Sequence, residues 1–178
     1  MSLKTDFIIK VLHVVSWIIF IGLCIETGGL TFNYVYSLFK PIIAKHSYMG
    51  LNLSEIYREN KITYTAFFSF AIIISGLKAF IFYLIIEIFL KLNMVKPFSE
   101  KIASLISKMS YHAFSVGILG IIAHQFTKRF IHRGYDVDII EKYWNDSAAF
   151  LMMAAILFII AQIFQKGLEL QSENELTV

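Results

Sequence analysis

Two ionisable side chains stand deep inside long apolar stretches of this sequence. Glu26 and Lys78 each lie near the middle of such a stretch, and a lone charge in the hydrocarbon core of a membrane costs about 3 kcal/mol or more. A carboxylate and an ammonium group offset this cost when they pair. We therefore predict an ion pair between Glu26 and Lys78. Such a pair either fixes the register of two helices or lines a polar cavity or proton path.

A second polar layer is expected nearer the side of the membrane that carries the termini. Glu87 comes late in one apolar stretch, whereas His13 and His112 come early in two others, so the three reach similar depth. Glu87 pairs either with His112 or with Lys91, which follows one helical turn later on the same segment. Both alternatives are open at this point.

Other kinds of chemistry find little support in the chain. His112 and His124 are twelve residues apart, which is about 18 Å of helical rise, so they cannot share one metal ion or one haem iron. No HExxH pattern, glycine-rich phosphate loop or nucleophile-base cluster is present,. The net charge of +3 is spread over connections, which argues against direct nucleic-acid binding. We expect no metal, no cofactor and no enzymatic activity.

The segments that position these residues are long and apolar. The chain is 57% hydrophobic and only 16% charged, and a helical membrane span takes about 20 apolar residues. We predict an all-α integral membrane four-helix bundle with antiparallel up-down connectivity, because a membrane barrel would show short alternating segments instead. Residues 1–178 form one domain that contacts the lipid bilayer. The expected spans are 7–38, 64–91, 102–128 and 146–166, followed by a soluble tail at 167–178.

The third span has a clear start. Pro97 ends the preceding structure, and Ser99 is a favourable N-cap,. Ile102, Leu105 and Met109 recur at helical spacing with lysine and serine between them. This amphipathic start is expected to lie in the membrane interface before the helix enters the bilayer.

The fourth span is expected to have ordinary interfacial ends. Tyr143 and Trp144 suit the interface away from the termini, where amphipathic rings gather,. Gly167 follows Lys166 and suits a left-handed cap that ends the helix,. An even number of spans places both termini on one side, but Lys and Arg are nearly balanced between the two sides, so charge does not orient the chain.

Two short motifs carry a family resemblance. The Pro97-Phe98-Ser99 turn and the ending Glu173-Asn174-Glu175-Leu176-Thr177-Val178 resemble those of an uncharacterised family of small bacterial membrane proteins with four spans. The resemblance implies the cytoplasmic (inner) membrane, with both termini in the cytoplasm. Genes of that family often pair with a small helix-turn-helix regulator, which implies such a regulator as a partner.

Two functions follow as hypotheses. The first is a non-enzymatic membrane protein that binds a regulatory partner through the face carrying both termini, where the two motifs form a docking surface. The alternative is a small carrier or channel whose polar path uses Glu26, Lys78 and Glu87. No feature of the sequence sets the oligomeric state.

Overall fold

The computed structural model describes residues 3–40, 53–92 and 98–176. These residues are helical with short connections, and no strand occurs among them, which confirms the all-α prediction. The elements are α1 (Leu3–Phe39), α2 (Ser54–Glu59), α3 (Lys61–Lys91), α4 (Glu100–Ile131), the short 3-10 helix η3 (Asp138–Tyr143) and α5 (Ser147–Leu176).

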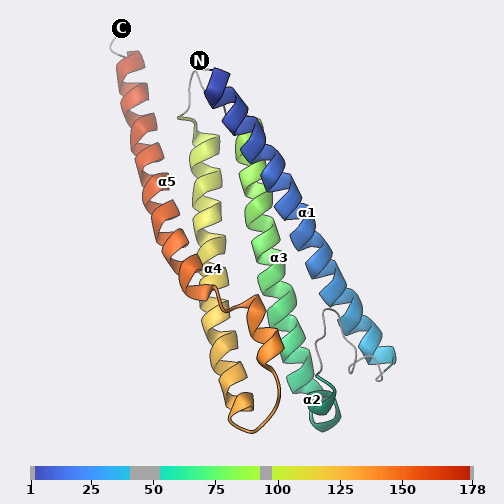
Figure 1. Cartoon of the computed structure of the whole chain (residues 1–178). Coiled ribbons are helices and arrows are strands. Elements are labelled where there is room, and N and C mark those ends of the chain that lie inside the picture. The colour runs from blue at the N-terminus through green and yellow to red at the C-terminus, as the bar shows by residue number, and fades with distance from the viewer. Residues whose placement is uncertain (1–2, 41–52, 93–97, 177–178) are drawn as a thin grey trace.

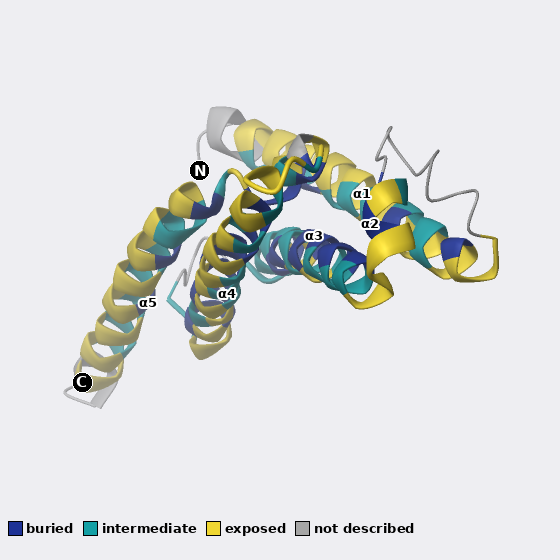
Figure 2. Ribbon diagram, turned by 90° about the horizontal axis from the view of Figure 1, so that it is seen from below, coloured by how far each residue is buried: buried dark blue, intermediate teal, exposed yellow. Residues whose placement is uncertain are grey.

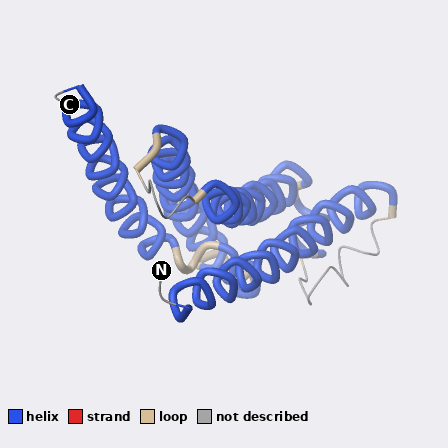
Figure 3. Tube along the Cα trace, turned by 90° about the horizontal axis from the view of Figure 1, so that it is seen from above, coloured by secondary structure: helices blue, strands red, loops and turns tan. Residues whose placement is uncertain are grey.

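The four long helices run alternately up and down, and both ends of the chain lie at the same end of the structure (Figure 1). Each long helix packs along the next one in sequence: α1 along α3, α3 along α4, and α4 along α5. Seen along the helices, they form an open, curved row with α1 and α5 at its two ends (Figures 2 and 3). The predicted antiparallel connectivity is therefore confirmed, in a bundle that is open along one side.

Large apolar side chains cover the outer surface of the row. In the most apolar window of α1 only 6% of residues are buried, against 44% in α4. Phe7, Ile18 and Ile25 are each more than 60% exposed. Soluble proteins do not expose apolar surface on this scale. All four long helices are long and apolar enough to cross a membrane, so these side chains are suited to contact with lipid.

Asparagine and serine caps set where α3 and α4 begin. The Asn60 side chain accepts hydrogen bonds from the backbone N–H groups of Ile62 and Thr63, and the Ser99 hydroxyl accepts one from Ile102. The predicted start of α4 is thus correct. Its apolar residues, however, pack inward: Ile102 and Ile106 join Ala161 of α5 in a small buried cluster. The first turns of α4 are amphipathic, with their apolar side facing neighbouring helices.

The fourth span departs from expectation at its beginning. The chain turns back after α4, forms η3, breaks over residues 144–146 and only then enters α5. Tyr143 and Trp144 are 3% and 1% exposed, so the prediction that they lie at the membrane interface is wrong. They are held inside the bundle because η3 packs against both α3 and α4.

The end of the fourth span also differs. The predicted helix end at Gly167 is wrong, because α5 continues through Gly167 to Leu176. A Cβ at Gly167 would lie 2.8 Å from the ring of Phe98. The glycine therefore provides room for an aromatic ring and does not cap the helix.

The contact between α4 and α5 depends on two further glycines. A Cβ at Gly117 would lie 2.5 Å from Leu151, and a Cβ at Gly120 would collide with the side chain of Ser147. The Ser110 hydroxyl donates a hydrogen bond of 2.9 Å to the Ala154 carbonyl across the same contact. Small residues thus let the two backbones approach closely, as is common between membrane helices.

We predict that Gly120→Ala lowers stability by about 1–3 kcal/mol, the usual range for overpacking a tight contact. The matched control is Gly28→Ala, because a Cβ at that position of α1 meets nothing within 4 Å. The midpoints of thermal unfolding in detergent micelles would be compared. Equal midpoints for the two variants would show that the α4–α5 contact is looser than described.

Candidate functional site

Lys78 is the centre of a polar site where the fourth span is broken. Its Nζ donates to the Tyr143 carbonyl at 2.9 Å and to the two carboxylate oxygens of Asp146 at 2.9 and 2.8 Å. The ammonium also lies 5.2 Å from the centre of the Phe150 ring. Only 12% of the Lys78 side chain is exposed. One side chain near the middle of α3 thus binds both sides of the break.

Local sequence explains why the helix is interrupted there. The Glu141 carbonyl accepts hydrogen bonds from the backbone N–H groups of Trp144 and Asn145, which closes η3. The Trp144 carbonyl in turn accepts from the N–H and the hydroxyl of Ser147 at the start of α5. In a bilayer every backbone polar group has to be satisfied by protein. The Tyr143 carbonyl meets this requirement through Lys78.

A second polar contact lies on the α4 side of η3. The His124 Nδ1 is 3.3 Å from a carboxylate oxygen of Glu141, with 37% and 28% of the two side chains exposed. The short helix is therefore tied to α4 by this contact, while the residues that follow it are tied to α3 by Lys78. Among the described residues, no three His, Cys, Asp or Glu side chains gather as a metal site requires,.

The predicted ion pair between Glu26 and Lys78 is not formed, because Lys78 is bound to Asp146. The predicted depth of Glu26 nevertheless agrees with the packing. Thr27 Cγ2 lies 3.8 Å from the point where a Gly76 Cβ would stand, which places Glu26 within about one helical turn of Lys78 along the bundle. Glu26 is half-buried and makes no ion pair or hydrogen bond with the described part of the chain.

The second polar layer is not assembled. Glu87 forms an ion pair with Lys91, the alternative that the sequence left open, rather than with His112. His112 packs edge-on against Phe80, with ring centroids 4.8 Å apart. The remaining member, His13, stacks on a phenylalanine of α3, Phe89, at 5.7 Å and accepts a hydrogen bond of 3.1 Å from the Trp17 indole of its own helix.

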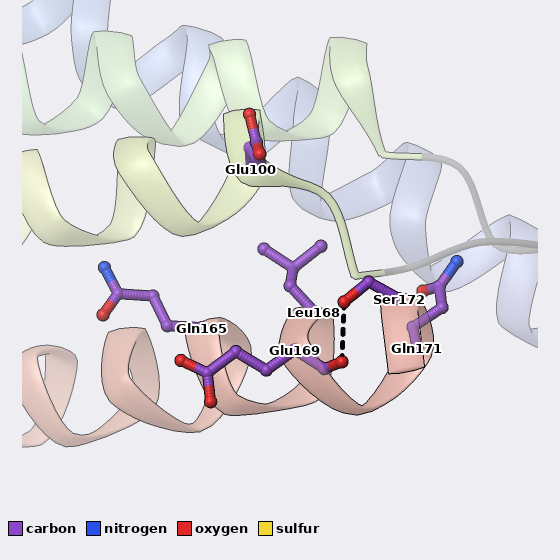
Figure 4. A pocket seen from close by; sticks show the side chains of 6 residues that line it. All are labelled: Glu100, Gln165, Leu168, Glu169, Gln171 and Ser172. Atoms are coloured by element: carbon purple, nitrogen blue, oxygen red, sulfur yellow. Dashed lines mark hydrogen bonds between the residues drawn. The ribbon is translucent and has the colours of Figure 1, made fainter. Parts of the chain in front are cut away.

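Phe98 of the first motif packs against α5 at the terminal end of the bundle. Phe98 covers Gly167 and lies 5.1 Å, centroid to centroid, from Phe164. Next to this contact is an open groove of about 470 Å³ (Figure 4). It is lined by Glu100, Gln165, Leu168, Glu169, Gln171 and Ser172.

The structure describes the other residues of the predicted docking surface only in part. Glu173 is exposed on α5. The backbones of Asn174, Glu175 and Leu176 continue the helix, although their side chains lie outside the description. Pro97, Thr177 and Val178 lie outside the described residues.

Asp146 is the residue that the sequence prediction missed. The predicted fourth span begins at residue 146. This prediction puts the Asp146 carboxylate at the membrane surface, where it needs no partner. Ile139, Ile140, Tyr143 and Trp144 precede it. These apolar residues before Asp146 were the available signal that the buried segment begins earlier.

Four long helices, each long and apolar enough to cross a membrane and joined by an internal ion pair, define a multi-span α-helical membrane protein. The chain belongs to a family described as protein of unknown function (DUF2975), whose model matches residues 48–178. The matched residues include Lys78, Asp146 and both motifs at the terminal end. No curated protein and no solved structure matched the chain.

We predict that Lys78→Met lowers stability by about 1–3 kcal/mol, the cost of leaving buried hydrogen-bonding groups unsatisfied. The combined variant Lys78→Met/Asp146→Asn should lose less than the sum of the two single changes, because the two residues interact. Thermal unfolding in detergent measures both.

The control is Lys166→Met, which removes a lysine paired with Glu169 on the surface, where both side chains are more than 60% exposed. Exposed pairs contribute little, so its midpoint should stay close to that of the unmodified protein. Strictly additive losses at positions 78 and 146 would contradict the pairing.

Proposed function

We propose that this protein is a non-enzymatic membrane protein that binds a small helix-turn-helix regulator through the face carrying both termini. In this proposal the chain lies in the cytoplasmic membrane of a bacterium, with both termini in the cytoplasm. The contact between Phe98 and Gly167 is the observation that carries it. That contact joins the start of α4 and the extension of α5 into one surface.

The extension of α5 supports a docking role in three ways. First, the helix continues beyond Gly167 to Leu176, so this part of the chain presents a fixed shape. Secondly, its exposed side chains are mixed: Lys166 pairs with Glu169 at 2.7 Å, and Ser172 donates to the Glu169 carbonyl at 2.8 Å. Thirdly, Leu168 points from α5 toward the first turn of α4 (Figure 4), which supplies an apolar contact inside a polar rim. Interfaces are commonly built in this way.

The carrier or channel alternative is favoured by a different observation. Lys78 and Asp146 lie at a break in a membrane helix, and broken helices often form the binding sites of transporters. The path through Glu26, Lys78 and Glu87 is not continuous in the described residues, because Glu87 is bound to Lys91. The two functions separate experimentally: changes at Lys78 should abolish transport, whereas changes in the groove should abolish docking.

We predict that Leu168→Asp abolishes binding of the regulator. The matched control is Leu170→Asp on the same helix, since two residues are about 200° of helical rotation and Leu170, 51% exposed, does not line the groove. Both variants would be purified from native membranes in mild detergent, and the bound proteins would be identified by mass spectrometry.

The proposal requires a small DNA-binding protein that is retained by the unmodified chain and by Leu170→Asp, and lost from Leu168→Asp. Equal thermal unfolding midpoints would show that the variants are folded. Retention of the regulator by both variants, or its absence from the unmodified chain, would overturn the proposal.

A further inference from the structure

Three ionisable groups lie close to one depth in the membrane. Lys78 binds Asp146 directly, and the contact between Thr27 and Gly76 places Glu26 beside the same part of α3. Lys78 is near the middle of the 31 residues of α3, which at 1.5 Å per residue matches the full thickness of a bilayer. The layer is therefore far from both membrane surfaces.

Glu26 and Lys78 also lie on the packed sides of their helices. Glu26 stands one turn before Leu30, which is fully buried, and Lys78 stands one turn after the fully buried Ile74. Residues four apart lie on the same side of a helix. Since α1 packs along α3, the two side chains lie on the packed sides of neighbouring helices, and the flexible stem of a lysine is suited to bridge such a separation.

Other titratable groups on the surrounding helices do not pair with Glu26 in the described structure. Glu87 is paired with Lys91 on α3, and His124 with Glu141 between α4 and η3. Further side chains of this kind on the helices around the layer include Cys24 on α1, Tyr64 and Tyr83 on α3, His112 on α4, and Lys142 and Tyr143 on η3. In the described structure, none of these groups forms an ion pair with Glu26.

The charge balance of the layer calls for one more positive charge. Lys78 neutralises one carboxylate, and a second ionised carboxylate at this depth would be an uncompensated charge in a medium of low dielectric constant. A single proton removes the imbalance. When two carboxyl groups compete for one counter-ion, one of them holds a proton and the protonation of the pair is shared.

We propose that Glu26, Lys78 and Asp146 form an intramembrane proton-binding site in which two carboxyl groups share one proton and Lys78 pairs with the ionised one. In the arrangement described here, Lys78 is on Asp146, so the proton is on Glu26. In the other arrangement Glu26 releases its proton and receives Lys78, while Asp146 takes up a proton. The net charge of the layer is zero in both.

The exchange has a structural consequence at the break. Lys78 satisfies the Tyr143 carbonyl as well as Asp146, so its movement to Glu26 removes both contacts at once. The link that holds the start of α5 against α3 is then lost. Proton binding in the membrane is thereby coupled to the position of the fourth span.

Infrared spectroscopy of the full chain in lipid bilayers tests this site, since a protonated carboxyl group has a carbonyl band separate from that of a carboxylate. At neutral pH the unmodified protein should show this band. Glu26→Gln should remove it, because the remaining carboxylate is paired with Lys78. Asp146→Asn should also remove it, because Lys78 then pairs with an ionised Glu26.

Lys78→Met gives the opposite expectation. Without the counter-ion both carboxyl groups take up protons, and the band should increase about twofold. Glu169→Gln is the control, because Glu169 is 61% exposed and lies outside the proposed site, so the band should be unchanged.

A protonated band absent from the unmodified protein, or kept in Glu26→Gln, would overturn the proposal. A band kept in Asp146→Asn would overturn the exchange of partners. The Asp146 and Lys78 variants test the site independently if Glu26→Gln fails to fold. The infrared measurement involves no partner protein. A negative result for the proton-binding site is therefore distinguishable from a negative result for the docking proposal.

Discussion

The ammonium group of Lys78 is the interaction on which the fourth span depends. It satisfies a backbone carbonyl at the end of η3 and the carboxylate at the start of α5, and so it allows the helix to break inside the bundle. Only 12% of the Lys78 side chain is exposed, against 41% of the Asp146 side chain, and an ion pair with a buried member contributes little net stability by itself, although removing one partner is costly. The pair is therefore better regarded as a determinant of which conformation the span adopts than as a source of overall stability.

Close packing between α4 and α5 stabilises the fourth span together with the ion pair. Gly117 and Gly120 let α5 approach α4, and the buried Trp144 and Tyr143 fill the space beside the break. On the other side, α1 is bound mainly through its row of contacts with α3. The fold thus has a tightly packed pair, α4 and α5, and a more peripheral first helix. The open row is a direct result, since α1 and α5 lie at its two ends (Figures 2 and 3).

Much of this architecture could be predicted from sequence because it depends on local and additive properties. The length and apolarity of the four runs predicted the helices, and Ser99 predicted the start of α4. The partner of Lys78 could not be predicted in this way. Depth alone suggested Glu26, and the depth was correct, but the choice between two carboxylates depends on a turn after α4 that brings Asp146 back into the bundle. Gly167 was misjudged for a related reason: its role is set by the Phe98 ring, which is distant in sequence.

The continuity of α5 has a mechanical consequence. A helix of 30 residues is about 45 Å long and behaves as a stiff rod over that distance. One end is anchored beside the Lys78 ion pair, and the other extends past Gly167 to Leu176. A tilt of about 10° at the anchored end would displace the far end by about 8 Å at this length. A helix of this length would therefore act as a lever, so that a small rearrangement at its anchored end gave a larger displacement at its far end.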